Sequence, residues 1–181
     1  APAGSGRGFV FRNSLASGLI PDMMLKAIED GLMDSMQGGV IAGYKMDDVM
    51  VTLVEAKYND LKSTDVAYRI AANMAFKDAV REAKPFLMEP IMKLEVVSPD
   101  EYTGDVINDL NSRRGKIENI DMRGQLKVID ALIPLSEAFG YATAVRSMSQ
   151  GRANHTLQFS HYDLVPESVM NRILGGYSGM Y

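Results

Sequence analysis

Three clusters of basic and polar residues are the parts of this sequence best suited to contact a nucleic acid. The first cluster is a polar run that contains Lys57, Tyr58, Asn59, Asp60 and Lys62. A tyrosine can stack on a base, an asparagine can hydrogen-bond to one, and lysines attract phosphate. However, a polar loop between a strand and a helix is usually a solvent-facing connection. On spacing alone, a solvent-facing loop is therefore the favoured interpretation of this cluster.

The second cluster is Arg113 and Arg114, followed directly by Gly115 and Lys116 at the predicted end of a helix. Cations at a helix C-terminus oppose the negative end of the helix dipole, so they stabilise a helix without binding anything else. The sequence supports a structural role and an RNA contact equally for these two arginines.

The third cluster contains Arg146, Gln150 and Arg152, with Ser147 and Ser149 between them, at another predicted helix end and turn. Guanidinium groups donate forked hydrogen bonds to phosphate, and hydroxyl and amide groups suit ribose. Such contacts need geometry rather than net charge, so RNA contact is slightly favoured for this cluster.

The residues that catalysis or metal binding would need are missing from the sequence. It has no cysteine, which excludes disulfides, thiol catalysis and cysteine-based metal sites. It also lacks the phosphate-binding pattern G-x-x-x-x-G-K-[ST], so we expect this chain alone neither to bind nor to hydrolyse a nucleotide. His155 and His161 lie on one predicted strand, roughly 20 Å apart, which is too far to share a metal ion. We therefore expect no catalytic residue, metal site or cofactor in this chain.

Composition limits the possible partners. The chain has 181 residues, 46% of them hydrophobic, and a net charge of −4, so a general positive field cannot attract nucleic acid to it. Any RNA partner must therefore be met by local clusters. No run approaches the ~18 apolar residues of a membrane span, and the N-terminus has no signal pattern, so we expect a soluble, cytoplasmic protein without a membrane partner.

The first half of the sequence predicts the order β-α-β-α after a glycine-rich lead, residues 1–8, that we expect to be an unstructured linker. The predicted elements are a strand at 9–11, a helix from an Asp22 N-cap to about 37, a strand at 47–55 and a helix from Ser63 or Thr64 to Lys84. Val66, Ile70 and Met74 form an apolar stripe on the last helix, flanked by Ala67, Ala71 and Ala75. These small residues permit close packing, so we expect this face to lie against the sheet. Pro85 and Pro90 then end the helical pattern.

The second half predicts the order β-α-β-β-α-β, which is the split βαβ arrangement of ferredoxin-like domains. The predicted elements are a strand from Ile91 to Val97, a helix from Pro99 to about 114 behind a capping box at 98–101, a hairpin of strands 116–122 and 125–133, a helix at 134–148 and a strictly alternating strand at 154–162. A short helix at 166–174 follows. The fold class is therefore α+β, with domains at 1–88 and 89–181.

Many short runs of this sequence, in order and at matching spacing, resemble the C-terminal end of bacterial elongation factor G over about residues 8 to 174. They include Phe9-Val10-Phe11-Arg12-Asn13, Ser63-Thr64-Asp65, Leu87-Met88-Glu89-Pro90-Ile91-Met92, Thr103-Gly104-Asp105-Val106, Pro134-Leu135-Ser136-Glu137 and Gln150-Gly151-Arg152-Ala153. The resemblance implies that residues 1–88 are similar to the fourth domain of that factor, whose fold is related to the second domain of a small-subunit ribosomal protein. Residues 89–181 are similar to its fifth, ferredoxin-like domain. The family's leading fourth-domain strands would precede Ala1, which predicts an exposed sheet edge.

The resemblance also implies partners. In the family, the fourth domain reaches the decoding region of the small subunit and accompanies the movement of tRNA and mRNA during translocation, and the fifth approaches the GTPase-associated region of the large subunit. We thus expect ribosome and rRNA contacts, with the protein a monomer in function. GTP and Mg would belong to an N-terminal domain, which makes the parent protein a GTPase.

The run from Tyr58 to Asp60 matches the family's fourth-domain tip loop, which strengthens the case for RNA contact there. Many members carry histidine where this chain has Asn59, which keeps hydrogen bonding but loses a chargeable ring. The same framework is shared by ribosome-recycling paralogues and ribosomal protection proteins, so those functions remain alternatives. A ferredoxin-like ligand-binding module or a scaffold remains the alternative from another class.

Overall fold

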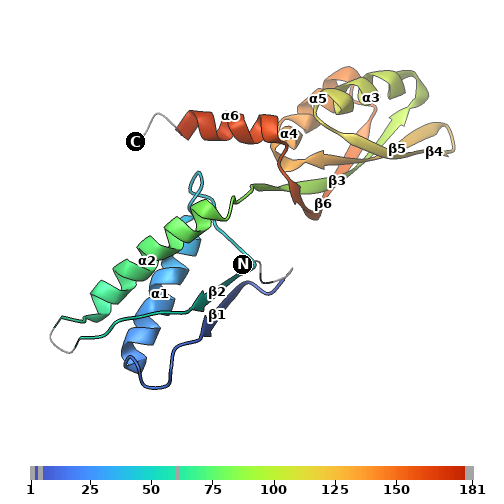
Figure 1. Cartoon of the computed structure of the whole chain (residues 1–181). Helices are drawn as coiled ribbons and strands as arrows, with labels where there is room; N and C mark the ends of the chain where they lie inside the picture. The colour runs from blue at the N-terminus through green and yellow to red at the C-terminus, as the bar shows by residue number, and fades with distance from the viewer. Residues whose placement is uncertain (1–2, 4–5, 60–61, 178–181) are drawn as a thin grey trace. The chain divides into compact units, whose positions relative to one another are not determined.

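The computed structural model describes Ala3, residues 6–59 and residues 62–177 (Figure 1). Spatial contacts divide the chain into two compact units. The first unit comprises Ala1–Pro85 and Ser168–Tyr181, and the second comprises Phe86–Glu167. None of the helices within the described ranges is long and apolar enough to cross a membrane.

The first unit has the predicted order β-α-β-α. Its elements are β1 (Phe9–Asn13), α1 (Asp22–Gly38), β2 (Val49–Leu53) and α2 (Asp65–Glu82). The two strands pair in parallel, with Phe9 opposite Val49, and a parallel pair needs a crossover, which α1 provides. The core lies between the strands and both helices. Its buried members are Ile20, Met24, Ile28, Leu32, Met36, Ala72, Phe76 and Val80.

The two helices of this unit cross closely at Gly31. A Cβ atom at Gly31 would lie 2.4 Å from the backbone oxygen of Arg69, so only glycine permits this approach. One turn along, the Nε atom of Arg69 lies 2.8 Å from Oδ2 of Asp34 on α1. The close approach at Gly31 and the ion pair between Arg69 and Asp34 therefore fix the N-terminal half of α2 against α1.

The prediction that Val66, Ile70 and Met74 pack against the sheet is wrong, because these side chains are 60%, 55% and 62% exposed. The buried stripe of α2 is instead formed by Ala72, Phe76 and Val80. Helix α2 carries two apolar stripes, and periodicity alone cannot say which one faces the core.

The starts of the two helices differ from one another. Thr64 caps α2 as predicted, since its Oγ1 accepts a hydrogen bond from the amide of Ala67 at 3.1 Å. Asp22, predicted as the cap of α1, is instead its first helical residue, and Pro21 occupies the cap position without a side-chain hydrogen bond. An aspartate in the first turn still opposes the positive end of the helix dipole.

Part of the glycine-rich lead is held in place by Asp48, which corrects the prediction of an unstructured linker. The amides of Gly6 and Gly8 donate to the Asp48 carboxylate at 2.9 and 2.8 Å. These backbone hydrogen bonds lower the pKa of Asp48. The start of β2 is thereby tied to the chain before β1.

The second unit has the predicted order β-α-β-β-α-β. It contains β3 (Met88–Pro99), a 3-10 turn η1 (Asp100–Tyr102), α3 (Thr103–Ser112), β4 (Lys116–Arg123), β5 (Leu126–Pro134), α4 (Leu135–Ala138), α5 (Tyr141–Met148) and β6 (Asn154–Leu164). The strand order is β4-β5-β3-β6, all antiparallel. Helix α6 (Glu167–Tyr177) follows β6.

Helices α3 and α5 cover one face of this sheet (Figure 1). The core between them contains Leu94 and Val96 of β3, Leu110 of α3 and Ile129 and Ile133 of β5, all 0% exposed. Burying each such side chain stabilises the fold by about 1.5–3 kcal/mol. The sheet and its helices therefore form a rigid base for the arginines at their ends.

Two local predictions for this unit are wrong. No capping box forms at Ser98, which is fully buried and pairs with Lys127 in the sheet, because strand pairing continues through Pro99. The predicted helix 134–148 is interrupted at Gly140, whose φ of 75° no continuous helix allows.

Strand β6 contains a bulge that its sequence pattern did not reveal. Phe159 pairs with Met92, but His161 pairs with Ile91, so Ser160 is an extra residue. Phe159 and His161 therefore face opposite sides of the sheet, which corrects the prediction of strict alternation.

Candidate nucleic-acid interface

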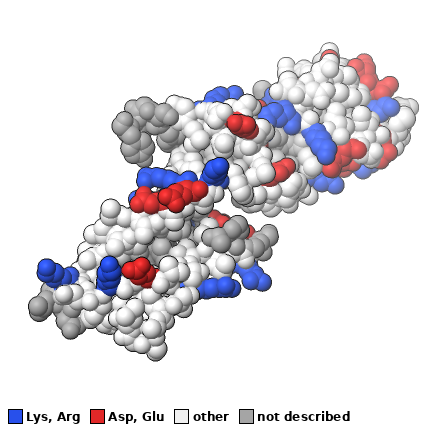
Figure 2. Space-filling model, viewed as in Figure 1, with Lys and Arg blue, Asp and Glu red and all other residues white. Residues whose placement is uncertain are grey.

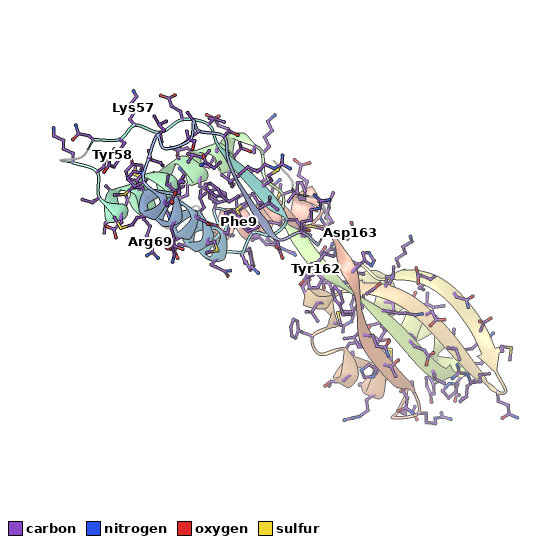
Figure 3. The ribbon with its side chains drawn as sticks, turned by 90° about the horizontal axis from the view of Figure 1, so that it is seen from below. Phe9, Lys57, Tyr58, Arg69, Tyr162 and Asp163 are labelled. Carbon is purple, nitrogen blue, oxygen red and sulfur yellow. The ribbon has the colours of Figure 1, made fainter. Side chains whose placement is uncertain are left out.

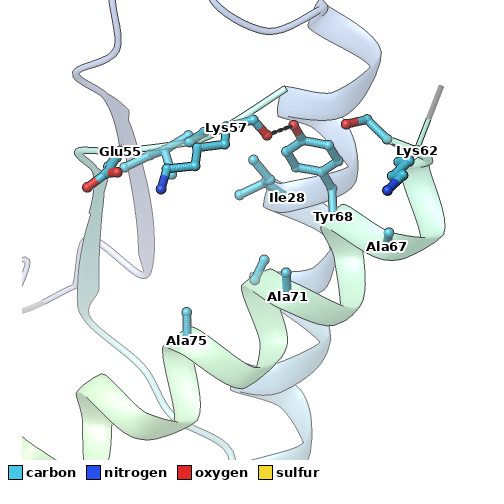
Figure 4. A pocket seen from close by; sticks show the side chains of 12 residues that line it. Ile28, Glu55, Lys57, Lys62, Ala67, Tyr68, Ala71 and Ala75 are labelled. Atoms are coloured by element: carbon cyan, nitrogen blue, oxygen red, sulfur yellow. Dashed lines mark hydrogen bonds between the residues drawn. The ribbon is translucent and has the colours of Figure 1, made fainter. Parts of the chain in front are cut away.

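The loop between β2 and α2 contains the first basic cluster and is fastened to α2 at its start. The Tyr68 hydroxyl donates a hydrogen bond of 2.6 Å to the backbone oxygen of Lys57 (Figure 4). The Lys57 and Tyr58 side chains lie next to each other on this loop (Figure 3), and both are exposed. A side chain on the first turn of α2 therefore holds the point where the polar run begins.

The loop is also closed at its other end. The Asn59 amide donates to Oγ of Ser63 at 2.9 Å, and the Asn59 carbonyl accepts from the amides of Ser63 and Lys62 at 2.8 and 3.1 Å. Two of these bonds join Asn59 to Ser63, the residue before the Thr64 cap, and the third joins Asn59 to Lys62. Asp60, the remaining predicted contact, lies outside the described residues. The loop backbone is thus held on both sides of the Asp60 position.

A groove of about 350 Å³ runs between the end of β2 and α2 below this loop (Figure 4). Its helix wall is a row of small side chains, Ala67, Ala71 and Ala75. Glu55 and Lys62 are among its charged members. No group of three His, Cys, Asp or Glu residues able to hold a metal occurs within the described ranges. The described lining of the groove thus combines small apolar side chains with charged ones.

Arg113 in the second unit is part of the fold. Its Nε lies 2.8 Å from Oδ2 of Asp109, and its Nη1 donates to the backbone oxygens of Glu137 at 2.9 Å and Phe139 at 3.4 Å. Its guanidinium carbon lies 5.5 Å from the ring centre of Tyr141, a phenol whose pKa is raised by burial. The side chain is 21% exposed. Arg113 therefore ties the end of α3 to the segment that joins α4 and α5.

Arg114 is likewise engaged within the second unit. It forms a two-point ion pair with Glu89 of β3, in which Nη1 lies 3.1 Å from Oε2 and Nη2 contacts Oε1. The hydrogen bonds to this carboxylate raise the pKa of Arg114. The Glu89 side chain is 11% exposed, so the pair is largely shielded from solvent.

Arg152 is paired but remains accessible. Its Nη2 lies 2.7 Å from Oε1 of Glu101, and its guanidinium stacks over the Tyr102 ring at 4.9 Å. The Arg152 side chain is still 53% exposed. A phosphate could therefore compete with Glu101 for the same guanidinium.

Arg146 and Gln150 are the exposed members of the third cluster with the fewest internal ties. Within the part of the chain that the structure describes, Arg146 has no ion-pair partner. Ser149, predicted as a donor to RNA, is instead buried, where its Oγ accepts from the amide of Ala153 at 3.0 Å and donates to the Val145 carbonyl at 2.6 Å. Ser149 thus shapes the turn that presents Gln150, whose φ is 53°.

Charge on the visible faces of both units is mixed. Figure 2 shows lysine and arginine side chains in small groups interspersed with carboxylates, with no continuous basic face in this view. Contact with RNA would then depend on single loops and helix ends.

Comparison with known proteins decides the family. The family model described as elongation factor G, domain IV, matches residues 1–84, and the one described as elongation factor G C-terminus matches residues 86–173. The chain belongs to the elongation factor G family. The elongation factor G of Fervidobacterium nodosum is 49% identical over 175 residues, which cover 97% of this chain and 25% of that protein. The elongation factor G of Thermotoga maritima is 48% identical over 173 residues, which cover 96% of this chain and 25% of that protein.

The fold agrees with this family. A crystal structure of a protein from Thermus thermophilus matches with a TM-score of 0.80 and 36% identity, over 96% of this chain and 26% of the other. The chain thus spans about a quarter of the length of the elongation factor G relatives it matches.

Proposed function

We propose that this chain is the ribosome-contacting part of a translational GTPase that promotes GTP-dependent translocation of tRNA and mRNA during protein synthesis. The observation that carries the proposal is the exposed run of Lys57, Tyr58 and Asn59, whose backbone is fastened to Tyr68 of α2 and to Ser63 just before α2, within the region that matches domain IV. A run whose backbone is already held by hydrogen bonds can enter a site on RNA without losing much conformational freedom on binding. Membership of the elongation factor G family supports translocation as the step to which this loop contributes.

The two domains, 1–88 and 89–181, divide this work. Lys57, Tyr58, Asn59, Asp60 and Lys62 contact the decoding region with its tRNA and mRNA. Arg146, Gln150 and Arg152 contact rRNA in the GTPase-associated region of the large subunit. Arg113 and Arg114 stabilise the fold of the same unit through their ion pairs. GTP and Mg bind in another part of the parent protein, and no reaction is catalysed by this chain.

The test uses an elongation factor G whose domain IV and C-terminal region are replaced by this chain. In single-turnover translocation, the double variant Lys57→Ala with Lys62→Ala should move mRNA about fivefold more slowly, if each lost phosphate contact contributes about 0.5 kcal/mol. Ribosome-dependent GTP hydrolysis should be unchanged. The matched control is Lys26→Ala with Lys45→Ala, two lysines elsewhere in the same unit. Equal translocation rates for the two double variants would overturn the proposal.

Ribosome recycling is the second candidate, favoured by Asn59 at the position where many translocating relatives carry histidine. A recycling factor would split ribosomes together with its partner factor and leave mRNA in place. If the chimera splits ribosomes without moving mRNA, recycling replaces translocation as the function.

A further inference from the structure

We propose that Tyr68 is the positioning residue of residues 57–59, the described start of the loop before α2, and that its hydroxyl group sets where Lys57 and Tyr58 present their side chains. The inference rests on the proposed function, because it assumes that the loop enters a site on RNA. Nothing about Tyr68 in the sequence alone distinguishes it from a tyrosine that fills the core.

The ring of Tyr68 is anchored independently of its hydroxyl. It is partly buried and packs against the apolar cluster of the first unit. Next to it, Arg69 pairs with Asp34 on α1, and the close approach at Gly31 fixes the same turn of α2. The Tyr68 oxygen therefore has a defined position relative to both helices.

The Tyr68 hydroxyl bonds to Lys57, which lies in the segment between β2 and α2 and belongs to neither a helix nor a strand. Its acceptor is the Lys57 carbonyl, 2.6 Å away and eleven residues earlier in the chain. Lys57 lies four residues after the end of β2, so strand pairing with β1 does not reach it. The Tyr68 bond is thus the described contact that fastens the near end of the loop, as the Ser63 hydroxyl fastens the amide of Asn59.

With Lys57 and Asn59 each held, Tyr58 lies between two fastened backbone positions. Its side chain is 38% exposed. Preorganisation of this kind raises the rate of a step that requires the loop in one place, because less entropy is lost when the loop binds. The structure assigns to the Tyr68 hydroxyl a role in the movement step, while the ring contributes to the packing of the first unit.

Removing the hydroxyl isolates this role. In Tyr68→Phe the ring keeps its packing, and the released Lys57 carbonyl can bind water, since the bond lies at an exposed site. We expect translocation by the chimera to slow about twofold to tenfold, the range of one net hydrogen bond. We expect the melting temperature and ribosome-dependent GTP hydrolysis to stay unchanged. Amide hydrogen exchange at Asn59 and Ser63 should become faster, with α1 unaffected.

The matched control is Tyr44→Phe, because Tyr44 is 53% exposed in the same unit and its hydroxyl has no described hydrogen bond. Slow translocation in Tyr68→Phe alone, with faster exchange in the loop, supports the inference. A Tyr68→Phe rate equal to that of the control, while Lys57→Ala with Lys62→Ala is slow, overturns the inference and leaves the proposed function intact. Loss of GTP hydrolysis and a lower melting temperature in Tyr68→Phe also overturn it, because they indicate a general structural role. If neither the tyrosine nor the lysine variant is slow, the proposed function itself fails.

Discussion

The loop of 57–62 and the arginine clusters of the second unit hold positive charge in opposite ways. In the loop, hydrogen bonds fasten the backbone, and no ion pair is described for Lys57 or Lys62 within the described residues. In the second unit, Arg113, Arg114 and Arg152 are each paired with a carboxylate of the same unit. The difference teaches that the number of cations in a cluster says little about the charge available to RNA. What counts is whether the fold has already neutralised those cations.

The largest expected effect is at Arg113. If Arg113 can be removed without loss of stability, the contrast between the loop and the paired arginines does not hold. Arg113→Ala deletes bonds to Asp109, Glu137 and Phe139, and charge-assisted bonds of this kind should make the loss about 2–3 kcal/mol. Arg146→Ala, the matched control, should change the free energy of unfolding by less than about 0.5 kcal/mol. Urea denaturation followed by circular dichroism measures both. Similar small losses would mean that Arg113 is as available to RNA as Arg146.

A change at Glu101 sharpens the comparison for the accessible arginine. Glu101→Gln removes the carboxylate paired with Arg152 but keeps the side-chain size, so Arg152 should become freer to bind phosphate. An exposed pair contributes about 0.5 kcal/mol, and ribosome binding by the chimera should therefore tighten about twofold. Glu118→Gln, an exposed glutamate on β4, serves as the control. Unchanged or weaker binding in Glu101→Gln would exclude Arg152 as an RNA contact.

The smallest expected effect is the pH dependence of the hydrogen bonds to Asp48. This carboxylate is held by backbone amides, whereas several carboxylates of the second unit are paired with arginines. Its pKa is lowered in the folded protein below its ordinary value of 3.8, chiefly by the hydrogen bond from Gly6 and then by that from Gly8. Its contribution to stability is therefore present above pH ~4 and is lost as the pH falls through the lowered folded-state pKa. The protection of the Gly6 and Gly8 amides against hydrogen exchange, relative to the intrinsic exchange rate at each pH, should fall over that acidic range. In Asp48→Asn this protection should be low already at neutral pH, and a protection that does not change with pH in the unmodified chain would contradict this account.

Local signals allowed much of the fold to be predicted from the sequence. Thr64 caps α2 and Gly124, with a φ of 67°, turns the β4–β5 hairpin, both because the cause lies within a few residues of the effect. The outward stripe of Val66, Ile70 and Met74 was misassigned because which stripe is buried depends on the crossing with α1.

The sequence proposes the residues of the candidate site, which stay a prediction, but it could not predict the contacts that those residues make. Tyr68 lies eleven residues from Lys57, and Glu89 lies 25 residues from Arg114, so no spacing rule connects either pair. Pairing across such separations is decided by the sheet register and the helix crossing. Sequence patterns therefore could not predict that the loop is fastened through its backbone while the arginines are paired with carboxylates.

Directed cleavage of rRNA on the ribosome tests the central claim most directly. The chain has no cysteine, so Lys57→Cys and Arg146→Cys each provide a single site in it for attaching an iron chelate that generates hydroxyl radicals. With the chimera bound to ribosomes, radicals from position 57 should cleave small-subunit rRNA near the decoding region, and radicals from position 146 should cleave large-subunit rRNA. Cleavage confined to the large subunit from position 57, or none from either position, would contradict the account.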